Sequence, residues 1–178
     1  VEEADRVVGT LRENGITDGI ESAIGREPWN LPSESEPSGT LPSPGPRAIE
    51  IINKLYRHNY RIVHIAAHGI HAMRGADGLE RTGVVLSDGV LITAAEIEAM
   101  EVVPDLVFLN CCHLGTIDAQ PNRFNRLAYS LARRLIEIGV RAVIVAGWAV
   151  DDEAARQFAE TFYRSWLHDR RTLGDAVF

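Results

Sequence analysis

Three short apolar runs along the chain predict the strands of one sheet. The runs are RIVHIAAH at residues 61–68, LVFLNC at 106–111 and RAVIVAGW at 141–148. They are rich in β-branched residues and apolar at consecutive positions, as strands buried on both faces are. The segments between them carry apolar residues three or four positions apart, the spacing of an amphipathic helix. The predicted helices cover about residues 2–14, 47–58, 122–138 and 152–168.

Turn and capping residues mark several boundaries between these elements. Asp88-Gly89 between the apolar runs of GVVLSDGVLIT predicts a hairpin. Thr93 followed by Glu96, and Thr172 followed by Asp175, are typical of helix starts. The segment 70–83, with three glycines, is expected to be a loop. A second loop, rich in Pro, Ser, Gly and Glu, is expected at 28–46; we interpret it as a flexible surface connection rather than as a regulatory or cleaved segment.

Alternation of buried strands with amphipathic helices predicts an α/β sandwich with a mostly parallel central sheet flanked by helices. Ligands of such sheets bind outside the carboxyl ends of the strands. Two predicted strands finish with reactive groups, one at His68-Gly69 and the other at Cys112-His113. If the two strands run parallel and lie side by side, these groups meet at one edge of the sheet.

Composition excludes several classes of function. The chain has 178 residues and a formal net charge of −7, so no basic surface points to nucleic acid. No apolar run is long enough to cross a membrane. Two adjacent cysteines cannot form a disulfide framework, which favours a reducing, cytoplasmic compartment. The chain begins without methionine and stops just after a predicted helix start. We therefore expect one domain, residues 1–178, from a longer protein.

A thiol and an imidazole at neighbouring strand ends suggest nucleophilic catalysis. His68 can act as the base for the thiol of Cys112, which lies 44 residues later in the chain. The backbone N–H groups of Gly69 and Cys112 can serve as an oxyanion hole. Because side chains alternate along a strand, Cys111 is expected on the face opposite Cys112.

Other roles for the same residues remain open. A cysteine at a strand end is often a small buried hydrophobe. Zinc is disfavoured, because the consecutive residues 111–113 cannot readily converge on one ion. A phosphatase loop is also disfavoured, since no arginine follows closely. We expect His64 and His71 to be structural or solvated and His113 to be a turn residue.

Four segments in order resemble the CHAT domain, a caspase-like and separase-like module of the caspase clan of cysteine peptidases. They are YRIVHIAAHG, TGVVLSDGVLITAAEI, DLVFLNCCHLG and AVIVAGWAVDDEAARQFAETFYRSWL, and the resemblance covers about residues 47–178. It implies a caspase-like three-layer sandwich and a Cys-His dyad with His68 as base and Cys112 as nucleophile. It also implies that no metal or organic cofactor is needed.

The resemblance implies further expectations about substrates and partners. Asn110, Asp151 and Asp152 would lie at the substrate cleft, although we favour a helix N-cap as the role of the two aspartates. Metacaspases have an aspartate where this chain has Asn110, so basic specificity is not expected unless Asp118, Asp151 or Asp152 supplies the charge. The parent would be a regulated bacterial protease cleaving proteins, with tetratricopeptide-type repeats or other domains in the same chain. The alternative is a catalytically silent interaction or scaffold module.

Overall fold

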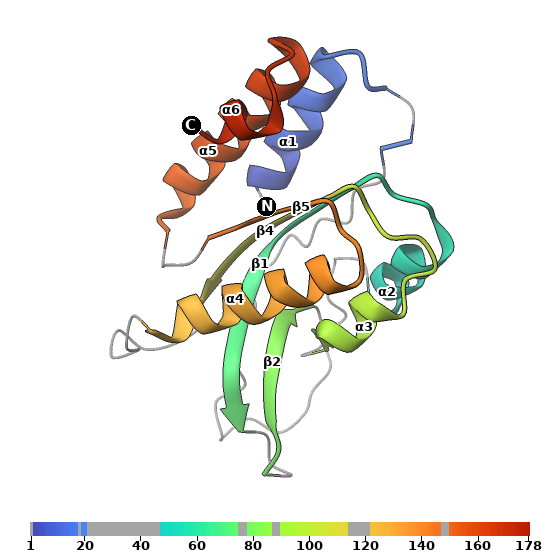
Figure 1. Cartoon of the computed structure of the whole chain (residues 1–178), viewed down its shortest axis with the longest axis vertical. Helices are drawn as coiled ribbons and strands as arrows, with labels where there is room; N and C mark the ends of the chain where they lie inside the picture. Colours follow the sequence, from blue (N-terminus) through green and yellow to red (C-terminus); the bar gives the residue numbers. More distant parts are fainter. Residues whose placement is uncertain are drawn as a thin grey trace. The chain divides into compact units, whose positions relative to one another are not determined.

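The computed structural model describes residues 2–17, 19–20, 47–74, 78–86, 90–113, 122–146 and 150–178 (Figure 1). The chain divides into two compact units. The first comprises residues 1–24 and 150–178, and the second comprises residues 25–149. The loop expected at 28–46 and the turn residues Asp88 and Gly89 lie outside the described residues.

The first unit is helical. Its elements are α1 (Glu2–Glu13), α5 (Asp152–Tyr163), the π-helical turn η2 (Arg164–His168) and α6 (Leu173–Val177). Helix α1 packs against α5, whose Phe162 and Tyr163 are fully buried. The ring of Phe162 lies edge-on to that of Tyr163, with 5.0 Å between their centroids. The helices expected at 2–14 and 152–168 are confirmed, although the second one ends in a π-turn.

The second unit is an α/β layer built on a five-stranded sheet of order β3-β2-β1-β4-β5. Its elements are α2 (Ala48–Arg57), β1 (Ile62–Arg74), β2 (Glu80–Val85), β3 (Leu91–Ile92), α3 (Ala94–Glu98), β4 (Leu106–His113), α4 (Asn122–Glu137) and β5 (Ala142–Val145). Strand β4 pairs in parallel with β1 and with β5, whereas β2 pairs antiparallel with β1 and with β3. The predicted α/β class is confirmed, but the sheet is mixed rather than mostly parallel.

The expectation of a loop over residues 70–83 is wrong. Strand β1 continues to Arg74 and returns through β2, forming a hairpin with Gly69 paired to Val84 and Ile70 paired to Gly83. One of the glycines that suggested a loop, Gly83, has another role. Gly83 lies inside β2, where the backbone of β3 comes too close to leave room for a side chain.

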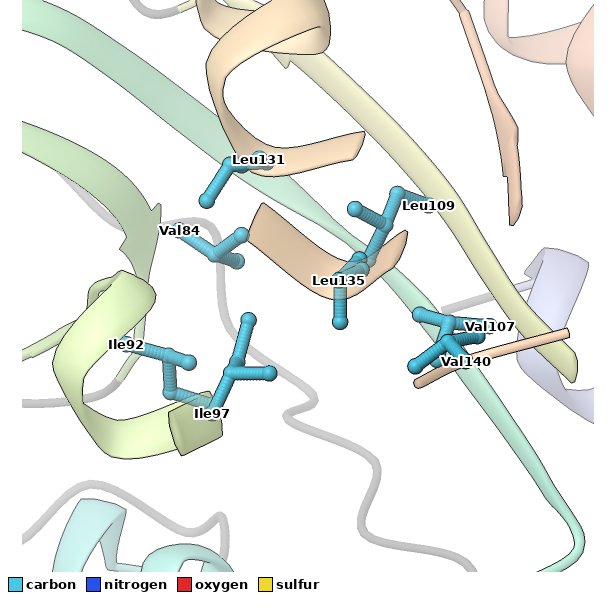
Figure 2. Close-up of a cluster of buried hydrophobic side chains, with 8 residues drawn as sticks. All are labelled: Val84, Ile92, Ile97, Val107, Leu109, Leu131, Leu135 and Val140. Carbon is cyan, nitrogen blue, oxygen red and sulfur yellow. The ribbon is translucent and has the colours of Figure 1, made fainter. Parts of the chain in front are cut away.

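One face of the sheet carries the hydrophobic core of this unit. Val107 and Leu109 of β4 belong to one buried cluster with Leu131 and Leu135 of α4, and Figure 2 shows Leu109 near Leu135 and Val107 near Val140. Partly buried side chains of β1, Val63 among them, and of α2 pack against the same cluster. Alternate positions of the central strands are therefore committed to packing, because side chains of a strand point to opposite faces in turn.

The capping box predicted at Thr93 is confirmed. The hydroxyl and the backbone N–H of Thr93 donate to the carboxylate of Glu96, with donor–acceptor distances of 2.6 and 2.7 Å. The hydroxyl oxygen of Thr93 in turn accepts from the N–H of Ala95. The two hydrogen bonds that Glu96 accepts from Thr93 lower the pKa of Glu96 below its ordinary value, and the bond from the hydroxyl has the larger effect. Thr172 caps α6 in the predicted place, accepting from the N–H of Asp175.

We expect Gly83→Ala to destabilise the protein. The added Cβ would lie 2.5 Å from the carbonyl oxygen of Ile92, a backbone atom that cannot move without shifting β3. Overpacking of this kind costs about 1–3 kcal/mol, measurable as a lower free energy of unfolding in urea. Gly9→Ala in α1 is the matched control, because nothing lies within 4 Å of its added Cβ. That variant should gain about 0.5–1 kcal/mol from reduced backbone entropy. An unchanged stability of Gly83→Ala would contradict the close approach.

We expect Tyr163 to make the protein sensitive to alkali. Burial, followed by the charge of Glu3, raises the pKa of Tyr163 well above its ordinary value near 10. Its contribution to stability is complete below the unfolded pKa and is lost as the pH rises above about 10 towards the folded pKa. Between pH 9 and pH 11 the free energy of unfolding should therefore fall less for Tyr163→Phe than for wild type, as measured by urea unfolding at each pH. Phe158→Leu in the same helix is the control: it changes a partly exposed aromatic residue and no titratable group, so its stability should follow the wild-type pH profile.

Candidate active site

The candidate catalytic residues lie on neighbouring strands in a fixed register. Strands β1 and β4 pair in parallel from Ile62 with Leu106 to Gly69 with His113, and His68 pairs with Cys112. Paired strands in a sheet lie about 4.8 Å apart. The condition under which the two candidate groups meet, that their strands run parallel and lie side by side, is therefore fulfilled.

A charged cluster fixes the opposite end of the same strands. The carboxylate of Asp105 accepts from Arg61 at 2.8 Å and pairs with Arg141 at 3.3 Å. Backbone hydrogen bonds join the same three segments. The N–H of Asp105 donates to the carbonyl of Arg61, and the N–H of Ala142 donates to the carbonyl of Asp105. The hydrogen bond from Arg61, together with the charge of Arg141, lowers the pKa of Asp105. These contacts lie at the aligned starts of the three strands.

The residue types at this cluster were visible in the sequence but their role was missed. Arg61, Asp105 and Arg141 each directly precede one of the three parallel strands. The acidic residue precedes the middle strand, and a basic residue precedes each of its two neighbours. This arrangement allows one ion pair between the starts of each two adjacent strands. This pattern of charges was the signal that could have predicted the strand order β1-β4-β5.

The two faces of the β1–β4 pair differ in character. Val63, Ile65 and Ala67 share the core face with Val107 and Leu109. On the other face His64 stacks on Phe108, with ring centroids 4.5 Å apart and planes inclined by 24°. This stacking confirms a structural role for His64.

The alternation of the strands also places the site positions. Positions 68, 110 and 112 follow 64 and 108 at steps of two, and therefore belong to the face opposite the core. Position 111 belongs to the core face, since it pairs with Ala67. His68 and Asn110 are each partly buried.

Two expectations about the strand ends are wrong. His68-Gly69 does not end its strand, because β1 continues to Arg74, and His113 is not a turn residue, because it is the last residue of β4. The pair Gly69–His113 marks the end of the described parallel ladder instead. Gly69 also pairs with Val84 on its other side, so its backbone lies within the sheet. The role of its N–H in an oxyanion hole stays a prediction.

The predicted substrate residues at the start of α5 lie in the helical unit. The carboxylate of Asp151 accepts from the N–H groups of Glu153 and Ala154 at 3.0 and 3.3 Å, so its role as an N-cap is confirmed. Asp152 is the first residue of α5 and is exposed. Substrate contacts of these aspartates and of Asn110 stay predictions, and Asp118 lies outside the described residues.

The described residues bear on two other classes of function. They contain no group of three or more His, Cys, Asp and Glu side chains arranged to hold a metal ion. Nor does any helix among those residues have the length and apolar character needed to cross a membrane.

Comparison with known proteins identifies the family. The family model for the CHAT domain matches residues 34–177, which include the whole sheet with both candidate catalytic positions. The chain therefore belongs to the CHAT-domain family, which is related to caspase-like cysteine peptidases. No curated protein and no solved structure matched the chain.

Proposed function

We propose that this chain is a cysteine endopeptidase domain that cleaves protein substrates through a dyad of His68 and Cys112. The observation that carries the proposal is the pairing of these two residues on adjacent parallel strands. Membership of a peptidase-related family supports it. The separation of neighbouring strands, about 4.8 Å, is well within the combined reach of an imidazole and a thiol.

The dyad performs a two-step acyl transfer. His68 takes the proton of Cys112, and the thiolate attacks the carbonyl carbon of the substrate. The carbon–nitrogen bond breaks as His68 returns that proton to the leaving amine, which leaves a thioester on Cys112. Water, deprotonated by His68, then attacks the thioester, releasing the acid and restoring the thiol. The backbone N–H groups of Cys112 and Gly69 stabilise the oxyanion in both steps.

The proposal extends to the fold and the setting of the enzyme. Its architecture is a caspase-like three-layer sandwich, and it acts within a larger bacterial protein whose repeats or other domains recruit the substrate. Asn110, two residues before the nucleophile, carries no charge. The position thus lacks the acidic group that would select arginine or lysine in the substrate.

The pH dependence of alkylation tests whether Cys112 is activated. In the Cys111→Ala variant the remaining thiol, Cys112, should react with iodoacetamide at a rate that changes little between about pH 6 and 8, because an imidazolium partner keeps it as thiolate. The Cys112→Ala variant leaves Cys111 as the matched control. Because position 111 belongs to the core face, its labelling should be slow and should rise about tenfold per pH unit between pH 6 and 8. Ordinary behaviour of Cys112 would support the silent scaffold module.

Substitutions of the dyad test the peptidase activity directly. In the full-length protein, Cys112→Ala should abolish cleavage of a proteome-derived substrate library, because no nucleophile remains. His68→Ala should slow cleavage at least about 100-fold through loss of the general base. Cys111→Ala should remain active, since position 111 lies on the core face. Activity that depends on Cys111 instead of Cys112 would overturn the assignment.

A further inference from the structure

Arg170 has a backbone conformation that arginine rarely adopts. It lies in the short connection 169–172 between η2 and α6, and its φ of 54° belongs to the left-handed region. Within the described part of the chain, it is the one non-glycine residue with a positive φ. Helices often end with a left-handed residue, but that residue is usually glycine, because the Cβ of another side chain is strained there. An arginine at position 170 therefore lowers the stability of the connection.

The helical turn before Arg170 is also unusual. In the π-helical turn η2 the N–H of Asp169 donates to the carbonyl of Arg164, five residues back, at 3.1 Å. The N–H of Arg171 donates to the carbonyl of Ser165 at 3.1 Å and fixes the backbone directly after the strained residue. π-Helical turns and strained non-glycine residues both occur frequently at functional sites. Together these features point to a role for the connection beyond joining two helices.

Two adjacent cationic side chains of this connection have no acidic partner. The neighbouring acidic side chains are already engaged: Asp169 pairs with His168 at 2.9 Å, Asp175 accepts from the hydroxyl of Thr172 at 2.7 Å, and Glu160 accepts from Arg164 at 2.8 Å. Arg170 and Arg171 are exposed, and among the described residues neither side chain forms an ion pair or hydrogen bond. The connection thus presents two unpaired guanidinium groups on a chain whose formal net charge is −7.

We propose that Arg170 and Arg171 form a docking site for an acidic segment of a partner protein. A guanidinium binds a carboxylate through two parallel hydrogen bonds, which gives such a pair both strength and orientation. Two adjacent arginines therefore match a segment in which carboxylates follow one another closely, such as consecutive glutamates. The negative net charge of the chain disfavours an extended polyanion, so a short acidic segment fits the site better than DNA or an anionic membrane.

Binding of a fluorescent hexaglutamate peptide to the full chain tests this proposal. The affinity of wild type should fall as sodium chloride rises from about 50 to 300 mM, because the contacts join exposed charges. The double variant Arg170→Gly/Arg171→Gln should bind about tenfold more weakly, as the loss of charge-assisted hydrogen bonds predicts. Arg12→Gln/Arg133→Gln is the matched control, since it removes two exposed arginines of other helices and should bind like wild type.

Urea unfolding of Arg170→Gly separates docking from a structural role. This single variant should unfold at a higher urea concentration than wild type, because glycine adopts the left-handed conformation without strain. It should nevertheless bind hexaglutamate severalfold more weakly. Lower stability with unchanged binding would show that the arginine is structural and would overturn the proposal.

The remaining outcomes concern other occupants and the peptidase. Phosphatidylserine vesicles or a short single-stranded DNA that bind more tightly than hexaglutamate, through the same two arginines, would overturn the acidic segment as the occupant. Equal binding by the double variant and its control, or no binding of hexaglutamate at millimolar concentration, would overturn the site. Cys112→Ala should bind hexaglutamate like wild type, because the docking site does not rest on the proposed peptidase function.

Discussion

The parallel register of β1 on β4 is the constraint on which the rest of the second unit depends. A constant offset of 44 residues runs from the ion pair of Arg61 and Asp105 to the pair of Gly69 and His113. A slip of one residue would turn Val107 and Leu109 away from the core and bring position 111 onto the face of His68. Burial of the apolar face thus selects the register, and the register selects which cysteine stands beside the histidine. The same register therefore determines both the packing of the core and the pairing of His68 with Cys112.

The sequence predicted the elements that a strong local pattern determines. The apolar runs, the amphipathic helices, the Thr93 capping box and the glycine ends of α1 and α4 all follow from spacing and residue type, and Gly139 indeed takes a positive φ of 104°. Residues 70–74 of β1 were not predicted as a strand. Pairing with β2, rather than a local pattern, keeps them extended, and the glycines of the segment suggested a loop instead. The ion pairs of Asp105 were missed for a related reason, since they join residues far apart in the chain and only the strand order brings them together.

The same distinction applies to the candidate site. Residue type and position identified His68 and Cys112, and the two residues were placed together by the rule that parallel strand ends meet at one edge. What a linear pattern cannot give is the extent of pairing on each side of a residue. Gly69 looked like the end of a strand, yet β1 continues past it, and it pairs with Val84 of β2 and with His113 of β4. For Asp151 the sequence favoured a helix N-cap over a contact with substrate. Its two N–H donors show the capping role, which is local and therefore predictable.

The end of β5 gives the two sides of β4 different surroundings at the candidate site. Within the described residues, β5 ends at Val145 beside Leu109, whereas β4 continues to His113. Residues 110–113 therefore have a described strand partner only in β1, where position 112 pairs with His68. Our proposal requires a substrate carbonyl to reach position 112, and this position lies past the part of β4 that is paired on both sides.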